Sequence, residues 1–311
     1  MSPRQQGDRR TFLKVLSGAV ASLALAGIPK GTTRGRVGNE IRRRRLGSTG
    51  LEVSILGLGT ATIGLSGMSR SEAERILNRA LDAGINYIDT ASSYGDAEEK
   101  IGRVMKSRRQ EVVLATKSLE REKSAAAREI RRSLRRLQTE YVDLLQIHAV
   151  NYTRTLDRVL REDGSVAAAL EAKEQGLVRH IGISGHRRPA VIASALERYP
   201  FATALIPLSA ADKSFHDFEQ GVFSIARSKN VGVIGMKVLV DGRITGHTEA
   251  CLRYTMSLPI SCAILGVGSM QELEEDLRIA QAFRWMSDEE NLQVIEALQP
   301  RATAETLWWK R

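Results

Sequence analysis

The sequence predicts an α/β protein whose fold is a (β/α)8 barrel of the TIM type, preceded by a β-hairpin. From about Leu46 onward, eight short apolar runs alternate with helical patterns. The runs are apolar at nearly every position, which is typical of parallel strands covered on both faces. Eight such strands with intervening helices indicate a parallel sheet that closes on itself.

The predicted elements follow in chain order. The stretch RLGSTGLEVS, residues 45–54, predicts the hairpin, which turns at residues 48–50. The eight predicted strands are residues 55–58, 87–88, 112–115, 144–147, 180–183, 204–206, 231–234 and 263–265. The clearest helical patterns are residues 69–83, 122–137, 166–175, 188–198, 219–229 and 270–283.

Residues that start and end helices support these ranges. Ser69 with Glu72, and Ser269 with Glu272, have the spacing of a capping box. Three glycines, at positions 84, 176 and 232, follow helical patterns, where a left-handed residue is favoured.

An open, doubly wound sheet would show the same alternation of strands and helices. Such a sheet usually carries a Gly-x-Gly-x-x-Gly turn after an early strand. Here only Gly57-Leu-Gly59 resembles that turn, and Thr62 takes the place of the third glycine. The closed barrel is therefore the better prediction.

Composition excludes several classes of protein. The net charge is +10, but residues 1–45 hold 11 Lys and Arg against 2 Asp and Glu, which leaves about +1 for the other 266 residues. A basic terminus without a basic, aromatic-rich helix does not indicate nucleic-acid binding. Cys251 and Cys262 fit no metal-binding spacing, so we expect two buried thiols and no metal site. No apolar run is long enough for a stable membrane span.

The first residues resemble an export signal. The string DRRTFLK, residues 8–14, precedes an apolar segment that ends in Ala24-Leu25-Ala26. A charged region, an apolar core and a small-x-small end have the order of a signal peptide, and the paired arginines resemble the twin-arginine type. We therefore predict a signal over residues 1–26, a linker over 27–42, a barrel over 43–311 and a periplasmic or otherwise exported protein. Its partner would be the twin-arginine export machinery. An uncleaved anchor, or a basic tail before a short core helix, remains open.

Chemically active side chains follow the predicted strands. In (β/α)8 barrels the active site lies at the carboxyl ends of the strands. The residues at these ends are Asp89, Tyr94, Thr116, Lys117, His148, Ser184, Met236 and Lys237.

Four of these residues form a set with one chemistry. A free tyrosine is a weak acid with a pKa near 10, and a nearby ammonium such as Lys117 favours its phenolate. Asp89 would hold the ammonium, and His148 would position a substrate carbonyl. The set suits protonation of a carbonyl oxygen while a nicotinamide supplies a hydride to the carbon. Each residue also has a structural explanation: a turn cap, a half-buried phenol, a solvated strand end and a barrel histidine.

The chain resembles the aldo-keto reductase family over about residues 43–285. The motifs that carry the resemblance are the hairpin, GINYIDTASSYG (84–95), ATK (115–117), YVDLLQIH (141–148), GLVRHIGIS (176–184) and LGVGSMQELEED (265–276). The resemblance implies a single-domain NAD(P)H-dependent barrel oxidoreductase. It also implies a catalytic tetrad of Asp89, Tyr94, Lys117 and His148, in which Tyr94 is the general acid.

The resemblance further implies a cofactor site for NADP. Its expected residues are Gly59, Thr60, Asp89, Ser184, Met236, Lys237, Gly266, Gly268, Ser269, Glu275 and Asp276. Several positions depart from the family. Gly185 follows Ser184 where the family often has asparagine, Met236 stands where an aromatic ring commonly stacks, and no local cation accompanies Gly266–Asp276. NAD therefore remains possible.

Together these patterns predict reduction of an aldehyde or ketone, the small-molecule substrate, to an alcohol. Two other functions stay open. One is a nucleotide-binding sensor or regulatory barrel without significant turnover. The other is a lyase or epimerase that acts on oxidised sugars with a tightly held cofactor. Neither the substrate nor the oligomeric state is predicted.

Overall fold

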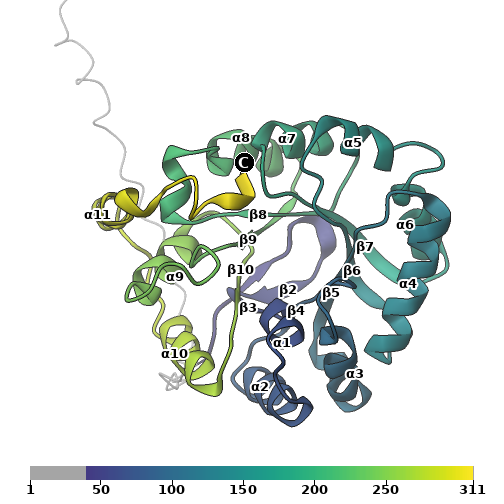
Figure 1. Cartoon of the computed structure of the whole chain (residues 1–311), viewed down its shortest axis with the longest axis horizontal. Coiled ribbons are helices and arrows are strands. Elements are labelled where there is room, and N and C mark those ends of the chain that lie inside the picture. The colour runs from purple at the N-terminus through teal and green to yellow at the C-terminus, as the bar shows by residue number, and fades with distance from the viewer. Residues whose placement is uncertain (1–39, 311) are drawn as a thin grey trace, which may run out of the picture. The chain divides into compact units, whose positions relative to one another are not determined.

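A computed structural model describes residues 40–310, so the predicted signal and most of the predicted linker lie outside the described residues. Eight parallel strands form a closed barrel, in which β10 pairs with β3 to complete the ring (Figure 1). The prediction of a (β/α)8 barrel is confirmed. The barrel strands are β3 (Leu56–Gly59), β4 (Tyr87–Asp89), β5 (Val113–Ser118), β6 (Val142–Ile147), β7 (Val178–Ser184), β8 (Thr203–Pro207), β9 (Gly232–Met236) and β10 (Cys262–Gly266).

The helices surround the barrel, as Figure 1 shows. They are α1 (Ala61–Leu65), α2 (Arg70–Asp82), α3 (Ala97–Arg108), α4 (Lys123–Leu137), α5 (Thr153–Val159), α6 (Ser165–Glu174), α7 (Pro189–Arg198), α8 (Phe218–Ser228), α9 (Thr248–Ser257), α10 (Met270–Gln281) and α11 (Asp288–Leu298). Short 3-10 turns are η1 (Gly47–Thr49), η2 (Arg109–Glu111), η3 (Ala210–Ser214), η4 (Gln299–Arg301) and η5 (Trp308–Lys310).

Helix capping agrees with the sequence in part. Ser69 and Ser269 accept hydrogen bonds from the third backbone N–H of α2 and α10. Gly84 and Gly176 follow α2 and α6 with positive φ, as expected. The interpretation of Gly232 was wrong, because it begins β9, and Asn230 takes the left-handed conformation instead (φ 53°).

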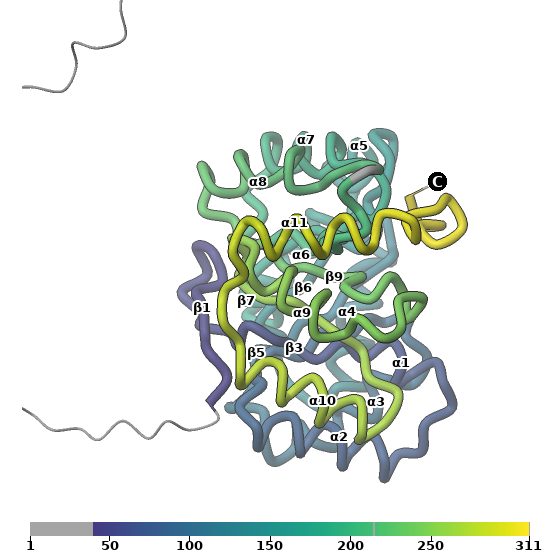
Figure 2. Tube along the Cα trace, turned by 90° about the vertical axis from the view of Figure 1, so that its left-hand side faces the viewer, coloured from purple at the N-terminus to yellow at the C-terminus, as the bar shows by residue number. Residues whose placement is uncertain are grey.

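The N-terminal hairpin closes one end of the barrel. Strand β1 (Arg43–Arg45) pairs antiparallel with β2 (Glu52–Ser54), which confirms the predicted hairpin. Its Leu46 and Val53 are buried with the side chains that fill the barrel interior, among them Tyr87 and Leu144. Figure 2 shows the hairpin at one end of the barrel and the C-terminal residues at the other. The open end is therefore the end where the strands finish.

A second, larger core lies between the barrel and the helices. It holds apolar faces such as Ile76 and Leu77 of α2, and it includes Ile41, just before the hairpin. Both cysteines are free and buried. Among residues 40–310, none of the helices combines the length and the apolar character needed to cross a membrane.

Candidate active site

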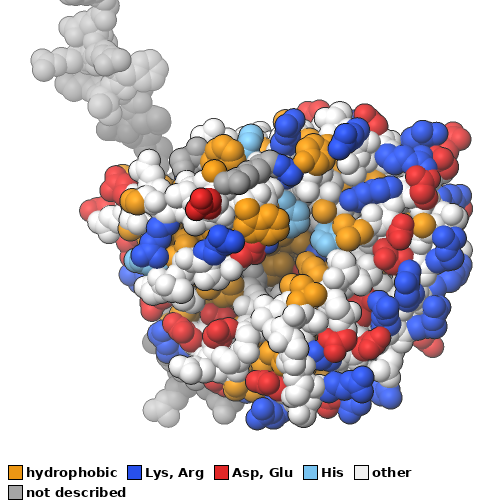
Figure 3. Space-filling view, in the orientation of Figure 1, with side chains coloured by type: hydrophobic (Ala, Val, Ile, Leu, Met, Phe, Trp, Pro, Cys, Tyr) orange, Lys and Arg blue, Asp and Glu red, His pale blue; other side chains and the backbone are white. Residues whose placement is uncertain are grey.

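A pocket of about 560 Å³ opens at the carboxyl ends of the strands, and Figure 3 shows it as a hollow with hydrophobic and histidine side chains around it. Asp89 and Tyr94 line the pocket, while Lys117 and His148 lie buried beside them. The four residues come from β4, β5 and the loops after β4 and β6. Because these strands are neighbours in the barrel, their ends bring the four residues together.

Lys117 is the centre of this group. Its side chain is 1% exposed. Its Nζ donates to Asp89 Oδ1, to the carbonyl oxygen of Thr90 at 2.7 Å and to the hydroxyl oxygen of Tyr94 at 3.3 Å. Burial is the largest single influence on the pKa of Lys117 and would lower it, but Asp89 and Tyr94 together outweigh burial, and the pKa is raised from its usual value. The lysine is therefore an ammonium held against a phenol.

The carboxyl of Asp89 is fixed on both oxygens. Gln146 Nε2 donates to Oδ2 at 3.0 Å, opposite the bond from Lys117 to Oδ1. The backbone N–H and hydroxyl of Thr60 both donate to the carbonyl oxygen of Asp89 at 3.0 Å. Burial raises the pKa of the Asp89 carboxyl, although Lys117 and Gln146 oppose that shift. This residue therefore holds Lys117 in place from a rigid strand end.

The loop that carries Tyr94 is seated on helix α1. A Cβ atom on Gly64 would collide with the carbonyl of Tyr94, and one on Gly95 would collide with the carbonyl of Gly64. The two glycines therefore let the loop and the helix meet backbone to backbone. The Tyr94 ring meets the ring of His148 edge-on, with centroids 6.0 Å apart.

His148 is a neutral imidazole. Burial, and then the neighbouring Lys117 cation, holds the pKa of His148 well below its usual value. Its Nδ1 is buried and has no hydrogen-bond partner within residues 40–310. A neutral imidazole beside the phenol can donate a hydrogen bond to a carbonyl oxygen, and it adds no second positive charge next to Lys117.

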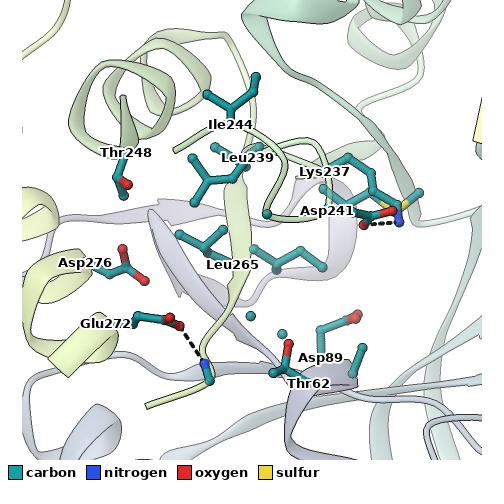
Figure 4. A pocket seen from close by; sticks show the side chains of 18 of the residues that line it. Thr62, Asp89, Lys237, Leu239, Asp241, Ile244, Thr248, Leu265, Glu272 and Asp276 are labelled. Atoms are coloured by element: carbon teal, nitrogen blue, oxygen red, sulfur yellow. Dashed lines mark hydrogen bonds and ion pairs between the residues drawn. The ribbon is translucent and has the colours of Figure 1, made fainter. Parts of the chain in front are cut away.

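The other end of the pocket is acidic. Figure 4 shows Glu272 and Asp276 of α10 on the side opposite Asp89, with Leu265 between. Glu272 Oε2 accepts the backbone N–H of Gly268 at 2.6 Å, so a predicted capping box is only half formed. Burial, together with Glu275 and Glu272, raises the pKa of Asp276 to about 7. The carboxyl groups at this end can accept hydrogen bonds from the hydroxyl groups of a ligand.

One cation lies among the described residues that line the pocket, Lys237, and it is paired with Asp241 (Figure 4). Trp308 and Trp309, near the C-terminus, contact the two members of this pair. Trp308 Nε1 donates to Asp241 Oδ2 at 3.2 Å, and Lys237 Nζ lies 5.0 Å from the ring centroid of Trp309. The loop after β9 is thereby tied to the end of the chain.

The predicted cofactor residues fall into two groups. Those that line the pocket are Gly59, Thr60, Asp89, Met236, Lys237, Gly266, Gly268, Glu275 and Asp276. Two do not: Ser184 is fully buried and accepts from the backbone N–H of Ala149, and Ser269 caps α10.

Sequence reasoning missed other residues of the pocket. His186 lines the same pocket as Tyr94 and lies two positions after Ser184, the last residue of β7. The loop after β9 contributes Leu239 and Ile244, which face Leu265 across the pocket (Figure 4). Extending the survey of strand ends by two residues would have found His186, but the loop has no local signal.

Comparison with known proteins agrees with this geometry. The model of the aldo/keto reductase family matches residues 55–250. The chain belongs to the aldo/keto reductase family. It is similar to YqkF of Bacillus subtilis, an uncharacterized oxidoreductase, at 28% identity over 83% of this chain and 96% of that one. It is also similar to L-galactose dehydrogenase of Arabidopsis thaliana, at 26% identity over 83% and 94%.

A solved aldo-keto reductase from Bacillus halodurans, in its holo form, superposes with a TM-score of 0.71. It shares 26% identity with 83% of this chain, and 96% of that chain is covered. The hairpin, barrel and pocket described above therefore belong to an aldo/keto reductase, and the enzyme class is oxidoreductase.

One departure of this aldo/keto reductase has a structural reason. A Cβ atom on Gly185 would lie 2.6 Å from Ile192 Cδ1 and 2.8 Å from the carbonyl oxygen of Val150. An asparagine therefore does not fit at this position without displacing the backbone after β6. The side chain that follows, His186, is the one that reaches the pocket.

Proposed function

We propose that this aldo/keto reductase reduces an aldehyde or ketone to an alcohol with NADPH, and that Tyr94 is the general acid. The observation that carries the proposal is the contact of Lys117 Nζ with both Asp89 and the Tyr94 hydroxyl, at the edge of a pocket large enough for a nucleotide. A paired ammonium beside a phenol stabilises the phenolate that remains after proton transfer.

The proton and the hydride come from different partners. NADPH, when bound in this pocket, would supply the hydride for the carbonyl carbon. The Tyr94 hydroxyl gives its proton to the carbonyl oxygen, and the negative charge left on Tyr94 is stabilised by Lys117, 3.3 Å away. The neutral ring of His148 orients the carbonyl oxygen toward Tyr94. Asp89 keeps Lys117 in position. The products would be an alcohol and the oxidised cofactor.

The residues around the pocket fit a nicotinamide dinucleotide. Met236, nearly buried at the end of β9, offers a polarisable thioether surface for the ring. Related proteins support NADP as the form used. Two aldo-keto reductases from Klebsiella pneumoniae, each 22% identical, were solved with NADP and NADPH. An aryl-alcohol dehydrogenase [NADP(+)] of Phanerodontia chrysosporium is 28% identical over 67% of this chain.

The test is the loss of NADPH absorbance when aldehydes and ketones are added to the purified protein. We expect turnover of at least one carbonyl compound, and loss of that turnover in Tyr94→Phe. A sensor barrel would bind the nucleotide without turnover of any compound. A lyase or epimerase would convert an oxidised sugar with no added nucleotide, and either result would contradict the proposal.

Glu272 is expected to weaken the binding of NADPH relative to that of NADH. The carboxylate of Glu272 accepts the hydrogen bond of the Gly268 N–H, just before α10. We place the adenosine phosphates at this helix start. Replacing the carboxylate in Glu272→Arg should tighten NADPH binding by about tenfold or more, because a cation then meets the extra phosphate. NADH binding should change much less. Fluorescence titration with both nucleotides measures the two dissociation constants.

Glu274→Arg is the matched control for this prediction. It makes the same charge change on the same helix, but Glu274 is exposed, pairs with Arg79 and does not line the pocket. Equal tightening for NADPH and NADH in Glu272→Arg, or an equal effect in Glu274→Arg, would mean that Glu272 does not face the extra phosphate.

We also propose that residues 1–26 direct export by the twin-arginine route. The support is the sequence alone, since these residues lie outside the described part of the chain. Fractionation of bacterial cells that make the full chain should find the protein in the periplasm. Arg9→Lys with Arg10→Lys should retain it in the cytoplasm, whereas Arg4→Lys should not. Export of the double variant at the normal level would argue against this route.

A further inference from the structure

His186 stands in the pocket on a backbone that has little freedom. Its N–H donates to Asn151 Oδ1 at 2.7 Å, which ties the end of β7 to the loop after β6. The preceding Gly185 packs so closely on Ile192 and Val150 that a Cβ atom would not fit. The imidazole is therefore presented to the pocket from a fixed position, as a binding residue must be.

The ring of His186 lines the pocket as a neutral group. Its Nδ1 is buried and has no hydrogen-bond partner within the described residues. Burial, followed by Lys237 and Lys117, lowers the pKa of His186 to about 3, so the ring is neutral. A neutral imidazole offers one donor and one acceptor. Because the ring lines the pocket, a bound molecule can hydrogen-bond to its accessible edge rather than to the buried Nδ1.

The position of His186 relative to His148 indicates which molecule. The two ring centroids are 6.3 Å apart, and His148 in turn meets Tyr94 edge-on. In the proposed reaction, Tyr94 and His148 hold the carbonyl oxygen. An oxygen that bonds to an imidazole nitrogen lies about 4 Å from the ring centroid. The two rings can therefore reach two oxygens on adjacent carbon atoms, one ring for each oxygen.

We propose that His186 binds a second oxygen of the substrate, on the carbon next to the carbonyl, so that the enzyme prefers α-hydroxy aldehydes and ketones. This inference rests on the proposed carbonyl reduction and extends it to a substrate class. The α-hydroxyl can donate to the acceptor nitrogen of His186 or accept from its N–H. The bond orients the carbonyl toward Tyr94 and distinguishes the substrate from its deoxy analogue.

The experiment compares kcat/KM for 2-hydroxypropanal and propanal, with NADPH, in the full-length wild type and three variants. Wild type should favour the hydroxylated aldehyde. His186→Leu should lower that preference by about tenfold or more, since a site that hydrogen-bonds a hydroxyl discriminates strongly against its absence. His186→Gln, which keeps a donor and an acceptor, should restore part of the preference. His180→Leu, on the same strand but outside the pocket lining, should leave it unchanged.

Nucleotide titration of the same variants separates the outcomes. We expect the NADPH dissociation constant of His186→Leu to match the wild type. If instead that variant loses NADPH affinity and keeps its preference for the hydroxyl, His186 holds the cofactor and the inference is wrong. An unchanged preference with unchanged affinity also overturns it. Failure of the wild type to reduce any carbonyl compound would count against the proposed function itself.

Discussion

Tyr94→Phe is expected to lower kcat by about a hundredfold to ten-thousandfold, because it removes the proposed general acid and little else. Lys117 would keep its bonds to Asp89 and to the carbonyl of Thr90, so the buried charge pair stays intact. The fold and the NADPH dissociation constant should therefore resemble those of the wild type. Steady-state kinetics, fluorescence titration and thermal unfolding measure the three quantities.

Tyr199→Phe serves as the control for this result. It makes the same substitution just after α7 and outside the pocket lining. Its kcat should match the wild type. If Tyr94→Phe retained wild-type kcat, the proton would have to come from another group, and the role proposed for Tyr94 would be wrong.

Lys117→Met is expected to damage both stability and turnover. The substitution leaves Asp89 buried, and among residues 40–310 only Gln146 then donates to its carboxyl. Removing one partner of a buried ion pair typically costs about 3 to 5 kcal/mol in the free energy of unfolding. Turnover should fall by at least about a thousandfold, since the cation that stabilises the phenolate is lost. Denaturant unfolding and steady-state kinetics measure the two losses.

The destabilisation should also depend on pH. Burial already raises the pKa of Asp89, and loss of Lys117 removes the charge that opposes this shift. A carboxyl whose folded pKa lies above its unfolded value adds stability at low pH and loses it as the pH rises through the folded pKa. Lys117→Met should therefore be closer to wild-type stability in mild acid than at neutral pH. An equal loss at both pH values would contradict the buried-pair explanation.

The double variant Asp89→Asn with Lys117→Met separates the two effects. It removes both charges, so it should recover most of the stability that the single variant loses. It should not recover turnover, because no cation then faces Tyr94. Recovery of both properties would show that Lys117 acts only by holding the fold.

The sequence by itself determined the barrel and the proposed catalytic group. Parallel strands that are covered on both faces leave continuous apolar runs, and each of the eight predicted strands overlaps an observed one. Because the strand ends of a barrel share one rim, Asp89, Lys117 and His148 could be placed together from their positions in the chain alone. The glycines that follow α2 and α6 were also readable, since left-handed backbone favours glycine.

Only the tertiary structure decided how the rest of the pocket is built. Helices α1, α3, α5, α9 and α11 were not among the predicted ranges, and α1, with five residues, is too short to show a period. Gly185 excludes a side chain because Val150 and Ile192, distant in sequence, pack against it. Loop residues such as Leu239 reach the pocket through contacts between loops, which no local pattern encodes. Local periodicity therefore specified the strands and their ends, while packing between distant segments selected which side chains face the pocket.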